Sequence, residues 1–234
     1  MTELRLVAPE AEDGPFTAGV PLPRRLPPGR HGIPANLVKE HQRLRLLAGM
    51  AEALGEHGYA NVTTTHISER ANVSTGTFYK HFGNLWDCLL AAYVAAADRL
   101  CAEIEAACAA SRDDDAFEAA GEGDALAAGI DAALAFFAAQ PELGQLLSAQ
   151  APREASALCA ARRILISRLA AMLRRTRGVD DAPQPPGLDE RLIDATLAFV
   201  HTRLVAGDAG RLTELGSELV AILDRPRVAP GYAR

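Results

Sequence analysis

One short segment gathers side chains whose chemistry suits a nucleic acid. Residues Arg70–Phe82, RANVSTGTFYKHF, place several hydroxyl groups beside a tyrosine, a lysine and a histidine. Hydroxyl groups and free backbone N–H groups at a helix N-terminus suit phosphate oxygens, and a short capped helix can place its first turn in the major groove of DNA. Such contacts require short, rigid helices that present these groups together.

Two short helices are predicted around this segment. Thr63 is a suitable N-cap for a helix over 64–71, because its hydroxyl can accept from a backbone N–H of the first turn. Ser74 is a suitable N-cap for a second helix over 75–81. The two predicted helices are separated by only three residues.

The residues between these helices predict a tight turn. Asn72 tolerates the positive φ that such a turn needs better than any residue except glycine. Ile67, Val73 and Phe78 are expected to pack inward and to hold the helices at a fixed angle. This spacing predicts a helix-turn-helix.

A longer helix is expected on each side of this unit. An amphipathic helix runs from about Ala35 to His57 and ends at Gly58, and Asn84 caps a helix that continues to about Ala110. The apolar stripe of the first of these helices consists of Leu37, Leu44, Leu47, Met50, Ala51 and Leu54.

Further helices are predicted towards the C-terminus, over about 124–139, from Pro141 onward and over about 153–175, followed by a proline-rich linker over 177–187. The last two helices carry a regular apolar seam, which consists of Ile193, Leu197, Val200, Leu204, Leu212, Leu215, Leu219 and Ile222. The seam faces either the protein's own core or a second copy in a four-helix bundle, and we assign these residues to the dimer interface.

Composition supports an all-α fold. The 234 residues are 49% hydrophobic and 5% aromatic, and residues with high helix propensity dominate. We expect an N-terminal three-helix DNA-binding domain with a helix-turn-helix, followed by a helical domain for ligand binding and dimerisation. The expected segments are a tail over 1–34, the DNA-binding domain over 35–83, the helical domain over 84–225 and a C-terminal tail over 226–234.

Charge is distributed unevenly, although the net charge is −6. Between Arg24 and Phe82 there are eight basic and four acidic residues, a net charge of +4, so the rest of the chain carries −10. This asymmetry indicates a basic module attached to an acidic body.

No secretory signal pattern and no apolar run of about 18 residues is evident, so we expect a cytoplasmic protein with no membrane partner. The four cysteines, at positions 88, 101, 108 and 159, show neither zinc-site spacing nor a disulfide framework. We expect reduced thiols, no metal site and no cofactor.

The whole constellation resembles the TetR family of tetracycline-repressor-like transcription regulators. The residues that carry the resemblance are Gly58-Tyr59, Thr63-Thr64, Ile67, Ala71-Asn72-Val73-Ser74, Gly76-Thr77-Phe78-Tyr79, His81-Phe82 and Leu89. The resemblance implies a homodimer, expected to act as a repressor, that binds a palindromic double-stranded DNA operator until a small-molecule effector enters the helical body.

The resemblance also implies DNA-binding roles for individual residues. Thr64, Thr77, Tyr79 and His81 would contact phosphates, as would Lys80; Thr65 and Thr75 would face base edges; Gly76 would allow close backbone approach; and Ser74 would combine capping with DNA contact. Leu85 stands where the family usually has a phosphate-binding lysine, which predicts weaker salt dependence of binding.

Two further assignments are expectations with an open alternative. Arg24, Arg25 and Arg30 form either a minor-groove arm or a solvated charge cluster. The candidate ligand pocket, for which an apolar ligand is expected, consists of Cys101, Ile104, Phe117, Phe136, Phe137, Arg163 and Met172, each of which also has an ordinary structural explanation.

Other functions fit the sequence less well. An enzyme would need converging acids, bases or metal ligands, and no nucleophile elbow, metal-ligand spacing or glycine-rich phosphate loop is present. A helical carrier protein belongs to the same rival class as the enzyme and is equally disfavoured. A ligand-independent activator or architectural DNA-binding protein remains the alternative regulator.

Overall fold

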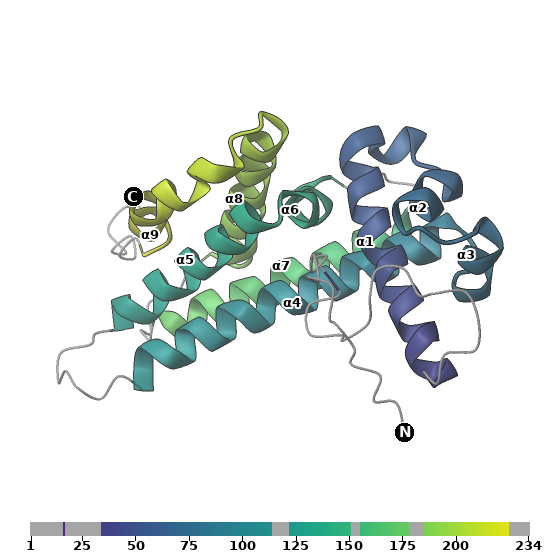
Figure 1. Cartoon of the computed structure of the whole chain (residues 1–234). Coiled ribbons are helices and arrows are strands. Elements are labelled where there is room, and N and C mark those ends of the chain that lie inside the picture. The colour runs from purple at the N-terminus through teal and green to yellow at the C-terminus, as the bar shows by residue number, and fades with distance from the viewer. Residues whose placement is uncertain (1–15, 17–33, 114–121, 151–154, 178–184, 225–234) are drawn as a thin grey trace, which may run out of the picture. The chain divides into compact units, whose positions relative to one another are not determined.

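The computed structural model describes residue 16 and residues 34–113, 122–150, 155–177 and 185–224. These residues are helical and contain no strand, which confirms the predicted all-α fold (Figure 1). The chain divides into two compact units, Met1–Ala92 and Tyr93–Arg234, with the boundary inside a continuous helix. The predicted tails over 1–34 and 226–234, with Arg24, Arg25 and Arg30, lie almost wholly outside the described residues.

The first unit contains α1 (Ala35–Asn61), α2 (Thr64–Arg70), α3 (Thr75–His81) and the first part of α4 (Leu85–Asp113). Gly58 interrupts α1 with a φ of 70° and a ψ of 171°, where the sequence predicted a stop. Because this φ is positive, glycine adopts it at little cost.

The predicted stripe of α1 is buried along most of its length. Leu47, Met50, Ala51 and Leu54 are buried, whereas Leu44 is half-buried and Leu37 is 48% exposed. The C-terminal half of α1 therefore carries the core of this unit, and its first turns contribute little.

Close packing joins α1 to α2 at Gly49. A Cβ atom at this position would lie 2.8 Å from the carbonyl oxygen of Ile67 and 3.0 Å from the backbone nitrogen of Ala71. Since both neighbours are backbone atoms, only glycine allows this approach.

The second unit contains the rest of α4, then α5 (Glu122–Ala139), α6 (Pro141–Ser148), α7 (Ser156–Thr176) and α8 (Leu188–Val205), followed by the 3₁₀ helix η1 (Ala209–Leu215) and α9 (Gly216–Leu223). Pro141 occupies the first helical position of α6, as predicted. The prediction that the last segment of the seam is one continuous helix was wrong. The 3₁₀ helix η1 carries Leu212 and Leu215, and α9 carries Leu219 and Ile222.

The start of α9 lies close against α5. A Cβ atom at Gly216 would collide with the carboxylate of Asp131 on α5. Gly216 therefore allows a close contact between two helices of the same chain.

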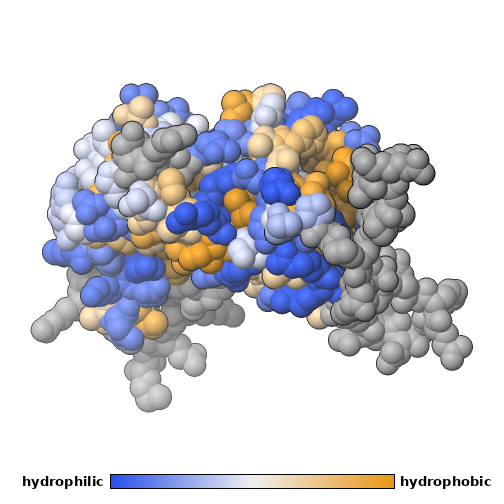
Figure 2. All heavy atoms as spheres, turned by 180° about the vertical axis from the view of Figure 1, so that it is seen from behind, coloured by the Kyte–Doolittle hydropathy of each residue, from blue (hydrophilic) through white to orange (hydrophobic). Residues whose placement is uncertain are grey.

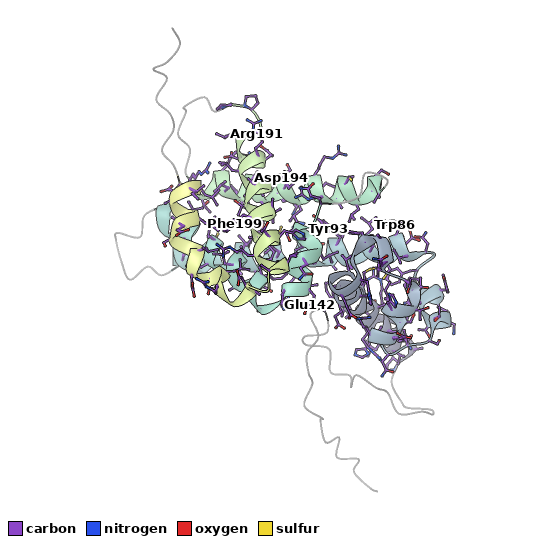
Figure 3. The ribbon with its side chains drawn as sticks, turned by 90° about the horizontal axis from the view of Figure 1, so that it is seen from above. Trp86, Tyr93, Glu142, Arg191, Asp194 and Phe199 are labelled. Carbon is purple, nitrogen blue, oxygen red and sulfur yellow. The ribbon has the colours of Figure 1, made fainter. Side chains whose placement is uncertain are left out.

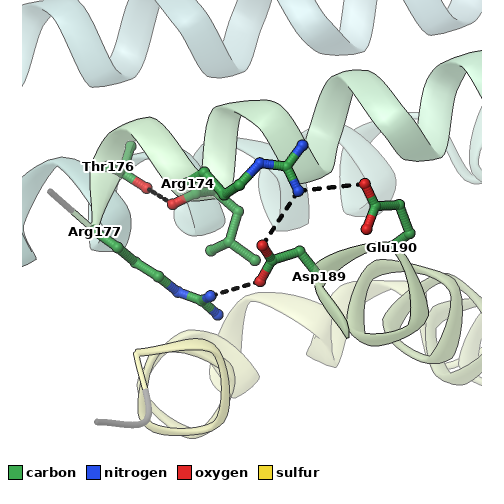
Figure 4. Close-up of polar contacts among 6 residues, drawn as sticks. Arg174, Thr176, Arg177, Asp189 and Glu190 are labelled. Carbon is green, nitrogen blue, oxygen red and sulfur yellow. Dashed lines mark hydrogen bonds and ion pairs between the residues drawn. The ribbon is translucent and has the colours of Figure 1, made fainter. Parts of the chain in front are cut away.

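Ion pairs tie α7 to its neighbours. Arg168 and Arg175 pair with Asp98 and Glu105 of α4, alongside which α7 runs (Figure 1). At the other side, the buried Asp189 of α8 accepts from Arg174 at 3.2 Å and from Arg177 at 2.7 Å (Figure 4). The two arginines compensate the negative charge of Asp189, which would be costly to bury without a partner.

Hydrophilic and hydrophobic residues alternate over the face shown in the space-filling view (Figure 2). Among the described residues, no single helix has the length and apolarity to cross a membrane; the bent pair Ala125–Ala139 and Pro141–Ser148 meets this criterion by length and composition alone.

Candidate DNA-binding surface and ligand cavity

The turn between α2 and α3 is a Schellman motif. Asn72 has a φ of 49° and is the only non-glycine residue with positive φ in the described part of the chain. The N–H of Asn72 donates to the carbonyl of Glu69 at 3.0 Å, and the N–H of Val73 donates to that of Ser68 at 3.0 Å. These bonds satisfy the free carbonyls at the end of α2. The predicted turn is confirmed.

A residue of α1 holds the same turn from outside. Nη2 of Arg45 donates to the carbonyl oxygen of Asn72 at 2.9 Å. A charged donor makes a stronger hydrogen bond than a neutral one. The guanidinium therefore links the position of the turn to α1, a contact that the sequence did not suggest.

Both predicted N-caps of the motif form. The Thr63 hydroxyl accepts from the N–H of His66 at 3.2 Å, and the Ser74 hydroxyl accepts from the N–H of Thr77 at 3.1 Å. Asn84 likewise accepts from the N–H of Asp87 at 3.0 Å at the start of α4. The side chains of Thr63, Ser74 and Asn84 thus fix where these helices begin.

Apolar side chains fix the angle between α2 and α3. Ile67 and Phe78 are fully buried, and the ring centroids of Phe78 and Phe82 lie 5.8 Å apart. Val73 is half-buried. The two short helices are therefore held by a compact core despite having seven residues each.

The residues expected to contact DNA differ in exposure. Thr64, Thr77 and His81 are half-buried, and the exposed members are Thr65, Ser74, Thr75, Gly76, Tyr79 and Lys80. Tyr79 is 57% exposed, so its ring and its hydroxyl group are accessible to a partner. The outer side of α3 therefore presents hydroxyl, phenol and ammonium groups together.

Positive charge surrounds the end of α3. Burial lowers the pKa of His81, and Lys39 and Arg43 lower it further while Glu40 opposes them. The guanidinium of Arg43 also lies 5.7 Å from the centroid of the Phe82 ring. These cations favour a bound anion near α3. Leu85, at the position where a lysine was expected by resemblance, is half-buried and adds no charge.

The second unit contains a partly open cavity of about 100 Å³ between α4, α5, α7, α8 and α9. On this measure a single water molecule needs about 10–15 Å³, so the cavity is large enough for several water molecules. The lining is almost entirely aliphatic and aromatic carbon.

The predicted pocket residues are placed in three different ways. Ile104, Phe137 and Met172 line the cavity. Cys101 and Phe136 are buried elsewhere in the core, and Phe117 lies outside the described residues. The assignment of Arg163 to the pocket needs correcting, because Arg163 is exposed on α7 and does not line the cavity.

Apart from Phe137, sequence reasoning missed the contribution of α5 to the cavity. Leu126, Ile130 and Leu134 line it from this helix, spaced four residues apart. That spacing is an apolar stripe, so a signal for these residues was present in the sequence.

Comparison with known proteins bears on the first unit directly. Residues 46–92, about a fifth of the chain, match the sequence model of the family described as "Bacterial regulatory proteins, tetR family". Residues 46–92, which include α2 and α3, therefore carry the domain that this family model describes. No curated protein matches the chain.

Several solved structures share the fold of this chain well beyond residues 46–92. The fatty acid degradation regulator FadR from Bacillus halodurans has 18% identity and a TM-score of 0.63, with 76% of this chain and 96% of that one covered. FadR from Bacillus subtilis, solved with stearoyl-CoA, has 19% identity and a TM-score of 0.60, with 77% and 96% covered. PfmR from Thermus thermophilus has 20% identity and a TM-score of 0.54, with 80% and 97% covered.

The apolar seam of the last helices faces the chain's own core, so its assignment to the dimer interface needs correcting. Six of its members are buried within the single chain: Ile193, Leu197, Val200, Leu204, Leu212 and Leu219. Leu215 is half-buried, and Ile222 is 43% exposed. The seam is buried because α8 and α9 pack on α5, α6 and α7 and line the cavity.

The opposite face of α8 is exposed and largely apolar, and the guanidinium of Arg203 lies 5.3 Å from the centroid of the Phe199 ring on it. Its residues recur at intervals of three and four, and they are Ala195, Ala198, Phe199, Thr202, Val205 and Ala206. Phe199, which is labelled in Figure 3, is 39% exposed, and Val205 is 65% exposed. We call these six residues the outer stripe of α8. Its alanines gave too weak a hydrophobic signal for sequence analysis to detect.

Proposed function

We propose that this protein is a transcription regulator that binds a palindromic DNA operator as a homodimer and represses until a small ligand occupies the cavity. The observation that carries the proposal is the fixed helix-turn-helix, in which a Schellman turn and two caps hold α3 with its polar side outward. A short helix presented in this way suits the major groove.

The proposed DNA contacts follow from exposure and chemistry. Tyr79 and Lys80 bind phosphates together with the half-buried Thr64, Thr77 and His81, while Thr65 and Thr75 face base edges. Ser74 and Gly76 bring the first turn of α3 close to the DNA. Arg24, Arg25 and Arg30 are proposed to add minor-groove contacts.

The proposed dimer uses the outer stripe of α8 together with Ile222 of α9. Large apolar side chains are exposed on these two consecutive helices, and such side chains are typical of an association surface. Pairing two copies through these helices forms a four-helix bundle. A palindromic operator requires the two α3 helices of such a dimer about 34–36 Å apart.

The proposed effector site is the cavity of the second unit. The FadR structure from Bacillus subtilis, which shares the fold, was solved with stearoyl-CoA, and this supports a ligand-responsive role for the helical body. A ligand shifts the operator equilibrium only if it prefers the form that does not bind DNA, and a coupling of about 1–3 kcal/mol is expected.

A DNA titration tests the DNA-binding part of this proposal. The purified protein is titrated against DNA from its own upstream region at two salt concentrations, beside Tyr79→Ala and Lys80→Ala. We expect tight binding that Tyr79→Ala weakens at least tenfold, and a salt slope that Lys80→Ala reduces by about one for each lost contact.

Two further variants complete this experiment. Arg211→Ala removes an exposed cation that pairs with Glu214 on η1, outside the DNA-binding domain, and should leave both quantities unchanged. Leu85→Lys restores the usual cation and should strengthen binding and steepen the salt slope. Equal losses in Tyr79→Ala and Arg211→Ala would count against the proposed surface.

A further inference from the structure

The cavity of the second unit is lined by side chains without ionisable oxygen or nitrogen. Asp, Glu, Lys, Arg and His are absent from its lining in the described part of the chain, and the only hydroxyl groups there are those of Thr176 and Thr196. A charged ligand group inside it would therefore have no oppositely charged side chain to pair with.

The hydroxyl groups of the lining have already committed their protons. Thr176 Oγ1 donates to the carbonyl of Leu173 at 3.0 Å, and Thr196 Oγ1 donates to that of Leu192 at 2.9 Å. The thiol of Cys108 similarly donates to the carbonyl of Ala125 at 3.3 Å. Backbone N–H groups within the helices are used by the helices themselves. Among the residues that the structure describes, the lining thus offers no free donor for a carboxylate or phosphate oxygen.

The same threonine hydroxyl groups can still accept a hydrogen bond from a donor group on a ligand. A threonine oxygen that donates its proton keeps lone pairs that accept a hydrogen bond. A neutral alcohol can therefore keep a partner in the cavity, whereas a carboxylate loses its hydration without replacement. Burial of an uncompensated charge is among the largest penalties in protein chemistry.

We propose, building on the ligand-responsive function above, that the cavity takes an uncharged, hydrocarbon-rich molecule with at most a hydroxyl group, and rejects the carboxylate of the same chain length. Any charged head group of a larger ligand must then lie outside the cavity.

Calorimetric titration of the full-length protein with matched pairs tests this directly. The pairs are hexanol and hexanoate, octanol and octanoate, and decanol and decanoate, at neutral pH, where the acids are ionised. We expect saturable binding of at least one alcohol, with its carboxylate bound at least about 30-fold more weakly.

A matched pair of variants places the binding in the cavity. Ala133 lines the cavity from α5, and Ala135 of the same helix is exposed. Ala133→Leu fills part of the space and should weaken alcohol binding at least tenfold, whereas Ala135→Leu should leave it unchanged. Circular dichroism spectra of both variants check that the helices are retained.

Three results would overturn the inference: equal affinity for an alcohol and its carboxylate, no saturable binding of any alcohol, or alcohol binding that survives in Ala133→Leu. Operator binding with and without octanol is measured in parallel. If octanol binds as expected but leaves DNA binding unchanged, the ligand class stands and the regulatory proposal fails.

Discussion

Arg45 shows how a single side chain outside the helix-turn-helix controls its geometry. Its guanidinium reaches the carbonyl of Asn72, the residue with positive φ at the turn. Because α3 begins shortly after this residue, a shift of its carbonyl moves the surface that α3 presents. Arg45 is therefore a positioning residue for the proposed DNA contact.

Replacement of Arg45 by methionine tests this role. Arg45→Met keeps most of the aliphatic stem and removes the hydrogen bond, so we expect the free energy of unfolding to fall by about 1 kcal/mol. DNA affinity should fall as well. Urea denaturation and DNA titration measure the two effects.

The control for Arg45 is Arg211→Met, because Arg211 forms an exposed pair with Glu214. Such pairs contribute little, so the free energy of unfolding should change by less than about 0.5 kcal/mol. If both variants lose the same stability and keep full DNA affinity, Arg45 does not position the turn.

Three histidines make stability depend on pH. Burial lowers the pKa of His41, His81 and His201 below the ordinary value of 6.5, with Arg45 adding to the effect at His41 and Lys39 and Arg43 at His81. As the pH falls below 6.5, the unfolded chain takes up protons that the folded chain resists. The folded state is thus destabilised at acid pH.

We therefore expect a lower urea midpoint at about pH 5.5 than at about pH 7.5. His201 contacts the Ser148 hydroxyl at 3.1 Å and carries no charge in this arrangement above its pKa. His201→Gln should reduce the difference between the two midpoints. A midpoint that is equal at both pH values would contradict the assignment of these histidines.

At the scale of elements, two glycines have different roles: Gly49 allows close helix packing, and Gly76 is proposed to allow close approach to DNA. Gly49 lies against the backbone of α2, and the nearest heavy atom to a Cβ at Gly76 would be the Ser74 hydroxyl oxygen at 3.7 Å. The first glycine is required by packing within the unit. The second has space in the free protein and is proposed to face DNA.

A matched pair of alanine substitutions separates these roles. Gly49→Ala should lower the free energy of unfolding by about 1–3 kcal/mol, because backbone atoms must move. Gly76→Ala should leave stability equal or slightly higher, since alanine has the higher helix propensity, yet it should weaken DNA binding. Full DNA affinity in Gly76→Ala would show that the first turn of α3 does not approach DNA closely.

Elements governed by local chemistry were predictable from the sequence. The caps at Thr63, Ser74 and Asn84 and the turn at Asn72 depend on residues within a few positions, so their types alone determine the geometry. The first position of α6 at Pro141 follows in the same way.

Features governed by packing were not predictable. Arg163 was expected at the cavity, but its neighbour Arg162 is the buried arginine and pairs with Asp194 of α8. One residue along a helix rotates a side chain by about 100°, and only the packing partner fixes which residue turns inward. The apolar seam of α8 was assigned to the dimer interface rather than to the core for the same reason.

At the scale of the whole molecule, the outer stripe of α8 makes association testable. Phe199→Glu places a charge in the proposed interface without disturbing the core, because Phe199 is already 39% exposed. We expect the native protein to sediment as a dimer and Phe199→Glu as a monomer with much weaker DNA binding. Ala135→Glu, on the exposed side of α5, should remain dimeric. A Phe199→Glu variant that stays dimeric would place the interface elsewhere.

The central claim is sequence-selective DNA binding by the tetR-type domain, and selection from a random pool of duplex DNA tests it most directly. After repeated rounds of binding to the full-length protein and amplification, we predict enrichment of a palindrome whose half-sites are centred about one helical turn apart. Tyr79→Ala should not enrich it. A pool that remains random with the native protein would contradict the claim.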